Sequence, residues 1–424
     1  MSNIKNNKIT KNDLKQLLHK NRIKRFALLR NSRRIFLEYA KKTNVFTNDL
    51  HKVSRTINCK YALSGGFEKV EVHCDSKTAY YVGLQTCGSI WTCPVCAARI
   101  SETRRKEVCH AMEKIYEEGF QSVMVTLTFP HDKTIALDEL IKKQSLALKY
   151  LREGNTWTCF KKRIDFQGLI RALELTYGAN GWHPHTHELW FVDKGLKEKD
   201  IKTFIVNRWI KCLKKAGLVS VKNTMATHSA LKTRSVDIKM NCKSSDYLSK
   251  NDNLNWGIDR EIAKAVNKGK SKGYHPFEFL EEITEVNSKL FIEYSKAMKG
   301  KSQLFWTPGL KEKLGVDDMT DEDICNEKDS DNENPLFDRE IYFTEEEWEI
   351  IAKKEYRAKI LNYFENAGEK IDECYEKIID LIKTNIENDK IIEDERKKIL
   401  SPNPVPDSYY LLETSQFDEI PEFN

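Results

Sequence analysis

Three histidines at alternate positions are the first residues in this sequence that could do chemistry. His183, His185 and His187 lie in a segment with the residue pattern of a β-strand, and alternation along a strand puts all three on one face. Imidazoles at that spacing can converge on one metal ion. A polar strand face that carries surface histidines is the alternative interpretation.

Glu174 is the acidic residue that the sequence places beside these histidines. The segment 178–181 (Gly-Ala-Asn-Gly) is a turn signal, and a hairpin centred on it pairs Glu174 with His185. Directly opposed residues have Cβ atoms about 5 Å apart. Two imidazoles and one carboxylate, with open coordination positions, suit Mg²⁺ or Mn²⁺ that holds a phosphate oxygen. The expected ligands are His185, His187 and Glu174, with His183 as a possible further ligand.

A cluster of cysteines predicts a second metal site. Cys87, Cys93 and Cys96 supply three thiols, the last two with the spacing of a zinc knuckle, and either Cys59 or Cys74 could be the fourth ligand. Four thiolates around Zn²⁺ make a closed structural site that contributes folding free energy. The cysteine count of eleven is odd and no secretion signal is visible, so metal ligands are expected rather than disulfides.

Helices and strands of mixed order must position these residues. Hydrophobic periodicity predicts strands at 121–129, 169–177, 185–192 and 235–240, and helices at 97–118, 134–152 and 197–216. Thr344 and Glu347 form a capping box that should begin a helical region reaching to about residue 400. We expect an α+β fold whose central antiparallel sheet is flanked by helices, with strand 121–129 beside the histidine strand.

The distribution of charge points to a polyanionic partner. Residues 316–424 carry 13 Lys/Arg and 32 Asp/Glu, so the remaining 315 residues have a net charge of +25 although the whole chain has only +6. A basic body of that size favours nucleic acid, and candidate backbone contacts are 161–163, 214–215 and 268–272. No stretch approaches the ~20 apolar residues that span a bilayer, and we expect a cytosolic protein without a membrane partner.

Three segments resemble the motifs of the HUH endonuclease family. They are VMVTLTF (123–129), GWHPHTHELWFV (181–192) and DYLSK (246–250). More closely, the chain resembles the rolling-circle replication initiators (Rep proteins) of small bacterial plasmids, which GLQTCGSIWTCPVCAARI (83–100) and GKSQLFWTPGLKEKLG (300–315) also resemble. The resemblance covers roughly residues 56–315. Thr186 departs from it, because the family usually has a bulky apolar residue there.

The resemblance implies a tyrosine nucleophile. A tyrosine oxygen can form a covalent phosphodiester, but with 16 tyrosines composition selects none. The Tyr-x-x-Lys pattern of the family matches Tyr247 and Lys250, which would share one face of a helix. The reserve candidates are Tyr274 and Tyr294. Some plasmid initiators carry a glutamate for a second cleavage one turn before the tyrosine, where this chain has Lys243.

The resemblance also implies ligands, a reaction and partners. His185 and His187 would bind the catalytic Mg²⁺ or Mn²⁺, with Glu174 as a plausible third ligand, and Cys59 matches the family's upstream zinc cysteine. The implied reaction nicks single-stranded origin DNA, leaving a 5′-phosphotyrosyl enzyme and a free 3′-hydroxyl for a host polymerase, with a host helicase as a further partner. The alternatives are an HUH-type mobilisation relaxase or transposase, and a non-catalytic zinc-dependent nucleic-acid-binding protein.

Six regions follow from these patterns. They are a basic helical N-terminal region (1–55), a zinc-binding cysteine module with a basic helix (56–115), an HUH nicking and joining domain (116–315), an acidic linker (316–343), a helical region (344–400) and a disordered tail (401–424).

Overall fold

Two compact units make up the described part of the chain. The computed structural model describes residues 11–74, 78–219, 225–243, 273–326 and 341–399. Unit 1 comprises Met1–Ile35 and Thr86–Lys328, and unit 2 comprises Phe36–Gln85 and Asp329–Asn424. Within the described ranges, the structure contains no helix with the length and apolar character needed to cross a membrane.

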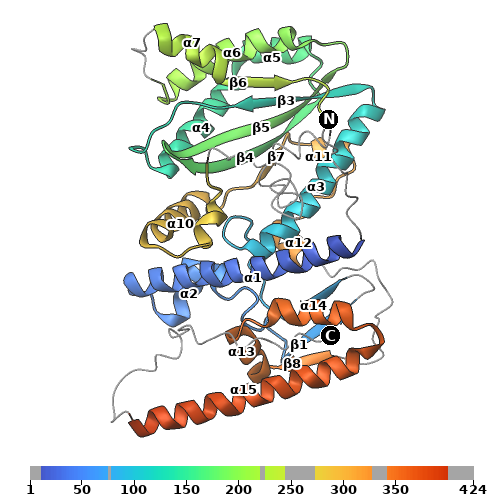
Figure 1. The fold of residues 1–424 in the computed structure, drawn as a ribbon. Coiled ribbons are helices and arrows are strands. Elements are labelled where there is room, and N and C mark those ends of the chain that lie inside the picture. The colour runs from blue at the N-terminus through green and yellow to red at the C-terminus, as the bar shows by residue number, and fades with distance from the viewer. Residues whose placement is uncertain (1–10, 75–77, 220–224, 244–272, 327–340, 400–424) are drawn as a thin grey trace, which may run out of the picture. The chain divides into compact units, whose positions relative to one another are not determined.

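A five-stranded antiparallel sheet forms the centre of unit 1 (Figure 1). Its order is β6-β3-β5-β4-β7, with bounds β3 (Phe120–Leu127), β4 (Gly168–Gly178), β5 (Gly181–Asp193), β6 (Val236–Lys239) and β7 (Leu304–Trp306). The strands expected at 121–129 and 185–192 lie side by side as β3 and β5. The sheet therefore confirms the predicted antiparallel centre, whereas the edge strand β7 was not predicted.

Helices surround this sheet. Unit 1 contains most of α1 (Lys11–Lys42), then α3 (Pro94–Glu117), α4 (Leu137–Leu151), α5 (Gly154–Arg163), α6 (Glu198–Lys215), α7 (Met225–Arg234), η3 (Pro276–Leu280), α10 (Glu285–Met298), α11 (Leu310–Lys313) and α12 (Asp321–Asn326). The three helices predicted at 97–118, 134–152 and 197–216 are α3, α4 and α6. Together with the sheet they confirm the α+β class.

Both faces of the central strands are covered, which explains why the residues of β3 are buried almost without interruption. On one face, α3 contributes Val108 and Met112 to a buried cluster with Met124 and Leu189. On the other face, the α5 ring of Trp157 meets the β5 ring of Trp190 edge-on, with 5.7 Å between centroids. The histidine face is the face of Leu189, because residues of equal parity along β5 point the same way.

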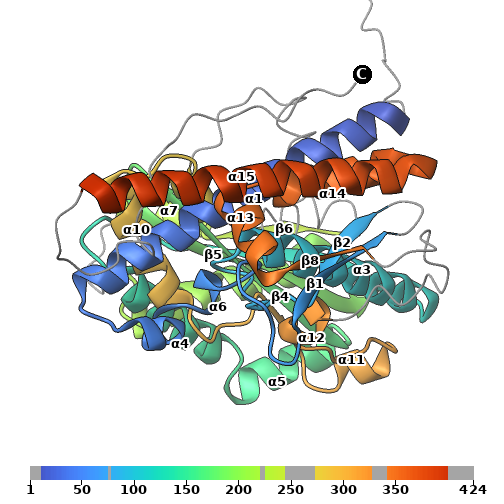
Figure 2. The same ribbon diagram turned by 90° about the horizontal axis from the view of Figure 1, so that it is seen from below.

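Unit 2 is built on a three-stranded antiparallel sheet of order β2-β1-β8 (Figure 2). Its elements are η1 (Thr47–Asp49), α2 (Leu50–Val53), η2 (Arg55–Ile57), β1 (Lys69–Cys74), β2 (Ala79–Val82), β8 (Ile341–Thr344), α13 (Glu345–Lys353), α14 (Arg357–Ala367), η4 (Gly368–Lys370) and α15 (Ile371–Ile399). The Thr344 hydroxyl accepts from the backbone N–H of Glu347, so the predicted capping box is confirmed. Strand β8, which precedes it, was not predicted.

A fully buried arginine joins the helices of unit 2 to the loop before β1. The Arg357 guanidinium donates to the backbone carbonyl of Lys60 (3.0 Å) and to the Glu355 carboxylate (2.7 Å), and it lies 3.7 Å from the centroid of the Tyr61 ring. Burial disfavours the charge, but Tyr61 and Glu355 outweigh it and raise the pKa of Arg357. A buried guanidinium that lost such partners would be costly.

Candidate metal centre and its surroundings

The β4–β5 hairpin sets the register that brings a carboxylate opposite the histidines. Gly178 pairs with Gly181 across a two-residue turn, and Glu174 pairs with His185, as the sequence predicted. Gly181 has φ +86°, and a Cβ there would lie 3.0 Å from the Lys133 backbone, so this turn needs glycine. The pairing confirms that Glu174 and the histidines project from one face of the sheet.

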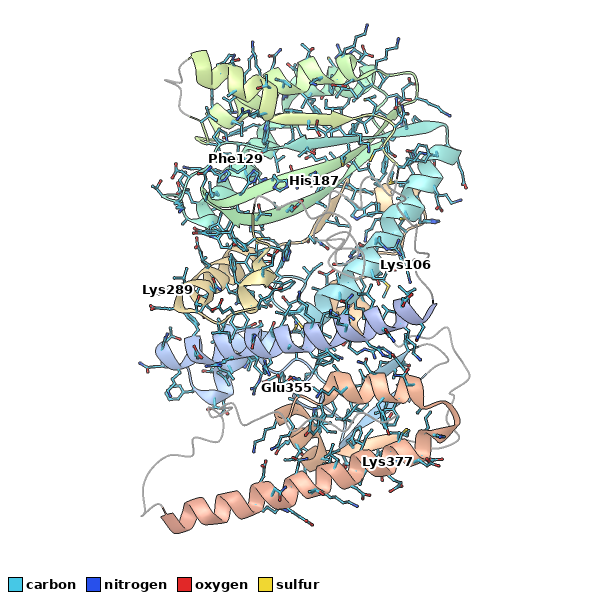
Figure 3. All side chains as sticks on the ribbon, in the orientation of Figure 1. Lys106, Phe129, His187, Lys289, Glu355 and Lys377 are labelled. Atoms are coloured by element: carbon cyan, nitrogen blue, oxygen red, sulfur yellow. The ribbon has the colours of Figure 1, made fainter. Side chains whose placement is uncertain are left out.

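Glu174, His185 and His187 meet at one point on that face; Figure 3 labels His187. The Glu174 Oε2 atom lies 2.9 Å from His187 Nε2 and 3.2 Å from His185 Nε2. Neighbouring ligands of an octahedral ion, each at about 2.1 Å from it, stand about 3.0 Å apart. The observed spacing and the mixed oxygen and nitrogen donors are therefore those of a group that could bind a metal ion.

The electrostatics of the group favour an ionised carboxylate. Glu174 is only 4% exposed, and burial alone would raise its pKa. The hydrogen bonds and charges of His185 and His187 outweigh burial and hold the pKa of this carboxyl well below its ordinary value. The carboxylate is thus available as an anionic ligand throughout the neutral pH range.

His183 lies on the same face but outside the three-residue group. Its Nε2 atom is 2.9 Å from the Thr128 hydroxyl, and its ring stacks between those of His131 (4.5 Å between centroids) and His185 (4.9 Å). Burial, reinforced by His185 and His131, lowers the pKa of His183 to about 4. His183 is therefore a neutral, stacked ring beside the three-residue group.

Both predicted histidine ligands have a partner for their second ring nitrogen, which the sequence did not reveal. The Nδ1 atom of His187 lies 3.0 Å from the Thr126 hydroxyl on β3, and that of His185 lies 3.4 Å from the His183 carbonyl. Thr126 pairs directly with His187 in the β3–β5 ladder. The alternation in the Thr-Leu-Thr run at 126–128 was the sequence signal that could have indicated these hydroxyl contacts.

Glu188 shows that a neighbouring carboxylate can serve a different purpose. It follows His187 in sequence but projects from the opposite face, where it is fully buried. It accepts from the Trp190 indole N–H (2.9 Å) and pairs with the Arg152 guanidinium. Burial lowers the pKa of Arg171, and Glu188 opposes that effect. This carboxylate compensates buried positive charge.

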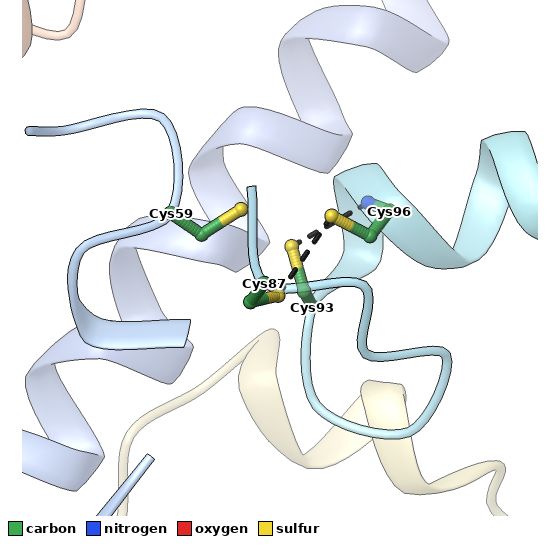
Figure 4. A group of neighbouring side chains, drawn as sticks. All are labelled: Cys59, Cys87, Cys93 and Cys96. Atoms are coloured by element: carbon green, nitrogen blue, oxygen red, sulfur yellow. Dashed lines mark hydrogen bonds between the residues drawn. The ribbon is translucent and has the colours of Figure 1, made fainter. Parts of the chain in front are cut away.

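The cysteine cluster also has the geometry of a metal site (Figure 4). Cys59, Cys87, Cys93 and Cys96 are all buried, and their sulfur atoms lie within 4.8 Å of one another. Thiolates at about 2.3 Å from a tetrahedral Zn²⁺ stand about 3.8 Å apart, and the sulfurs of Cys87 and Cys96 are 3.7 Å apart. The backbone N–H groups of Ser89 and Cys96 point at the sulfurs of Cys87 and Cys93, both at 3.4 Å.

The four-cysteine group includes Cys59, the predicted fourth ligand. The side chain of Cys74, the alternative, lies outside the described residues. Four buried thiols at this spacing could bind a metal ion.

Comparison with known proteins places the chain in a family. The family model described as "Replication protein" (Rep_1) matches residues 83–357. The chain belongs to this family of replication proteins. It is 25% identical over 340 residues to "Protein rep" of Streptomyces lividans, covering 65% of this chain and 74% of that protein. It is 30% identical over 139 residues to a "Neomycin resistance protein" of Streptomyces cyanogenus, covering 27% of this chain and 32% of that protein. No solved structure matches the chain.

In this replication protein the predicted nucleophile, Tyr247, and its companion Lys250 lie outside the described residues. Of the reserve candidates, Tyr294 is buried, and burial strongly raises the pKa of its hydroxyl. Tyr274 is exposed and forms a bridge with Tyr177 of β4. Residue 177 differs in parity from Glu174, so this bridge puts Tyr274 on the face opposite the carboxylate. Neither reserve candidate therefore presents an exposed hydroxyl on the face of the sheet that carries Glu174.

Four large aromatic residues of unit 1 lie in its core, where their rings cannot stack on DNA bases. The rings of Trp157, Phe160, Trp182 and Trp190 are all buried. Packing, the commoner role of such side chains, explains them. Of the basic runs, 161–163 and 214–215 end helices α5 and α6, and 268–272 lies outside the described residues.

Proposed function

We propose that this replication protein initiates rolling-circle replication of a plasmid by nicking single-stranded origin DNA, as an HUH endonuclease does. The observation that carries the proposal is the convergence of Glu174, His185 and His187 on one face of an antiparallel sheet. The family membership supports a replication role, and the spacing of the three ligand atoms supports Mg²⁺ or Mn²⁺ as the bound ion.

Each residue has a role in the proposed reaction. The Tyr247 hydroxyl gives up its proton as its oxygen attacks the scissile phosphorus, and the bond from phosphorus to the 3′ oxygen breaks. One proton passes to that oxygen, which leaves as a 3′-hydroxyl, so the step balances. The products are a 5′-phosphotyrosyl enzyme and a primer end for a host polymerase. Lys250 would stabilise charge on the phosphate. A bound divalent ion would polarise the phosphate and neutralise its charge.

The length of chain before Tyr247 permits this attack. The backbone N–H of Cys242 donates to the carbonyl of Ser122 on β3 (2.8 Å), and Cys242 belongs to the buried cluster on the histidine face. Ser122 is four residues from Thr126, about 13 Å along the strand. Tyr247 follows Cys242 by five positions, which can span up to about 17 Å. The tether is therefore long enough to bring Tyr247 to the metal ligands.

The residues that follow 244–272 in the chain are bound to β4, the strand that carries Glu174. Tyr274 and Tyr177 exchange two backbone hydrogen bonds of 2.8 and 2.9 Å. A Cβ on Gly273 would lie 3.1 Å from the Thr176 side chain, so the chain approaches β4 closely here. Both anchors favour delivery of the nucleophile from residues 244–272.

Zinc is proposed for the cysteine cluster in a structural role. Four buried thiolates leave no open coordination position for a substrate, which suits a closed site. Origin DNA, a host helicase and a host polymerase are the proposed partners, and the chain's basic character supports the first of them.

Covalent capture of DNA tests the proposal. The full chain is incubated with single-stranded DNA from its native replicon and Mn²⁺, and adducts are separated on a denaturing gel. An adduct is expected with the wild type and with Tyr274→Phe, and none with Tyr247→Phe or the double variant His185→Ala/His187→Ala. If no strand of the replicon yields an adduct, the protein is not a nicking enzyme, and the non-catalytic alternative gains support. The sequence that is cut separates an initiator from a relaxase or transposase.

A further inference from the structure

Two threonines, one near the end of β3 and one just after it, contact histidines of the neighbouring strand. The Thr126 hydroxyl lies 3.0 Å from His187 Nδ1, and the Thr128 hydroxyl lies 2.9 Å from His183 Nε2. Period-two alternation puts both threonines on the histidine face and Leu127 on the other. One of the two contacted rings is a proposed metal ligand and the other is not.

A histidine that binds a metal through Nε2 must carry its proton on Nδ1. That N–H needs an acceptor, which fixes both the tautomer and the orientation of the ring. The acceptor for His185 is the carbonyl of His183, at 3.4 Å from Nδ1. For His187 it is the Thr126 hydroxyl, and the His187 Nε2 atom on the other side of the ring faces Glu174 at 2.9 Å. The two ligand rings thus have equivalent partners, one from the backbone and one from a side chain.

We propose that Thr126 is a positioning residue that holds His187 in the tautomer and orientation required for metal binding. The inference rests on the proposed function, because it needs Glu174, His185 and His187 to bind a divalent ion. Thr126 faces His187 directly in the β3–β5 ladder, where opposed Cβ atoms lie about 5 Å apart. The hydroxyl is within reach without any distortion of the strand.

The side chain of Thr126 allows its hydroxyl to be tested separately from its shape. Valine has nearly the same shape and the same preference for strands, but it lacks the acceptor. Serine keeps the hydroxyl and loses the methyl group. Thr128→Val removes the equivalent bond from His183, one residue beyond the end of β3 and on the same face, and serves as the matched control.

The measurement is the affinity of the full chain for Mn²⁺ by isothermal titration calorimetry. Loss of the hydrogen-bond partner of a metal-binding histidine typically weakens metal binding by about 10- to 100-fold, and we expect that loss for Thr126→Val. Thr126→Ser and Thr128→Val should bind Mn²⁺ close to the wild-type affinity. A higher Mn²⁺ concentration should restore DNA nicking by Thr126→Val, and thermal melting without metal should show that all variants are folded.

Different outcomes would show failure of the proposed role of Thr126 and failure of the proposed metal site. Wild-type affinity in Thr126→Val, or equal losses in Thr126→Val and Thr128→Val, would overturn the inference alone. A wild type whose Mn²⁺ binding is absent, or is unaffected by Glu174→Gln, would overturn the proposed metal site and the inference with it.

Discussion

Replacement of Glu174 by glutamine should abolish the thermal stabilisation of the protein by Mn²⁺. Mn²⁺ at 100 times its dissociation constant adds about 2.7 kcal/mol to the free energy of unfolding. Unit 1, which contains Glu174, should gain about 2–4 °C in Tm for each kcal/mol of added stability. The Tm of the wild type should therefore rise by about 5–11 °C when Mn²⁺ is added. Glutamine occupies the same space but lacks the negative charge that sits 2.9 and 3.2 Å from the two Nε2 atoms. Without metal, the lost charge-assisted hydrogen bonds should cost only about 1.5–3 kcal/mol.

Glu188→Gln is the matched control, and differential scanning fluorimetry in EDTA and in Mn²⁺ is the assay. This carboxylate is also buried and lies next to His187 in sequence, but it faces Arg152 and Trp190. Breaking that buried pair should cost about 3–5 kcal/mol, so Tm should fall while the gain on adding Mn²⁺ persists. If Glu174→Gln keeps the Mn²⁺ gain, or if Glu188→Gln loses it, the assignment of the metal face is wrong.

Two further predictions concern the cysteine cluster and unit 2. Cys93→Ser should remove the bound zinc, measured by atomic absorption of the purified chain, whereas the exposed Cys159→Ser should retain it; equal zinc contents would contradict the site. Glu355→Gln should leave the buried Arg357 without its carboxylate and lower the free energy of unfolding of unit 2 by about 3–5 kcal/mol. Chemical denaturation measures this change, and an unchanged midpoint would show that the ion pair stabilises nothing.

The metal-centre geometry could be predicted where it depends on local pairing. A turn signal and two alternating strands fix a hairpin register, and the pairing of Glu174 with His185 followed from the turn alone. The pairing of β3 with β5 joins residues about 60 positions apart. We expected these strands to be neighbours, but the sequence does not show which residues of the two face each other, so the Thr126–His187 contact emerged only from the structure.

The elements that the sequence did not predict are held by distant partners. Strand β1 pairs with β8, which lies some 270 residues later, and β7 pairs with β4 across more than 100 residues. Strands β1, β7 and β8 are only three to six residues long, and their stability comes from neighbours that no local pattern names.

Parity along β5, rather than proximity in sequence, decides which carboxylate can serve the metal. Glu188 is adjacent to His187 but faces away from it, whereas Glu174 is 13 residues away and lies 2.9 Å from its Nε2. A slip of one residue in the hairpin would send Glu174 to the opposite face, because side chains alternate along a strand. The tight turn that ends at Gly181 prevents such a slip, and the proposed metal centre therefore depends on that turn as much as on its ligands.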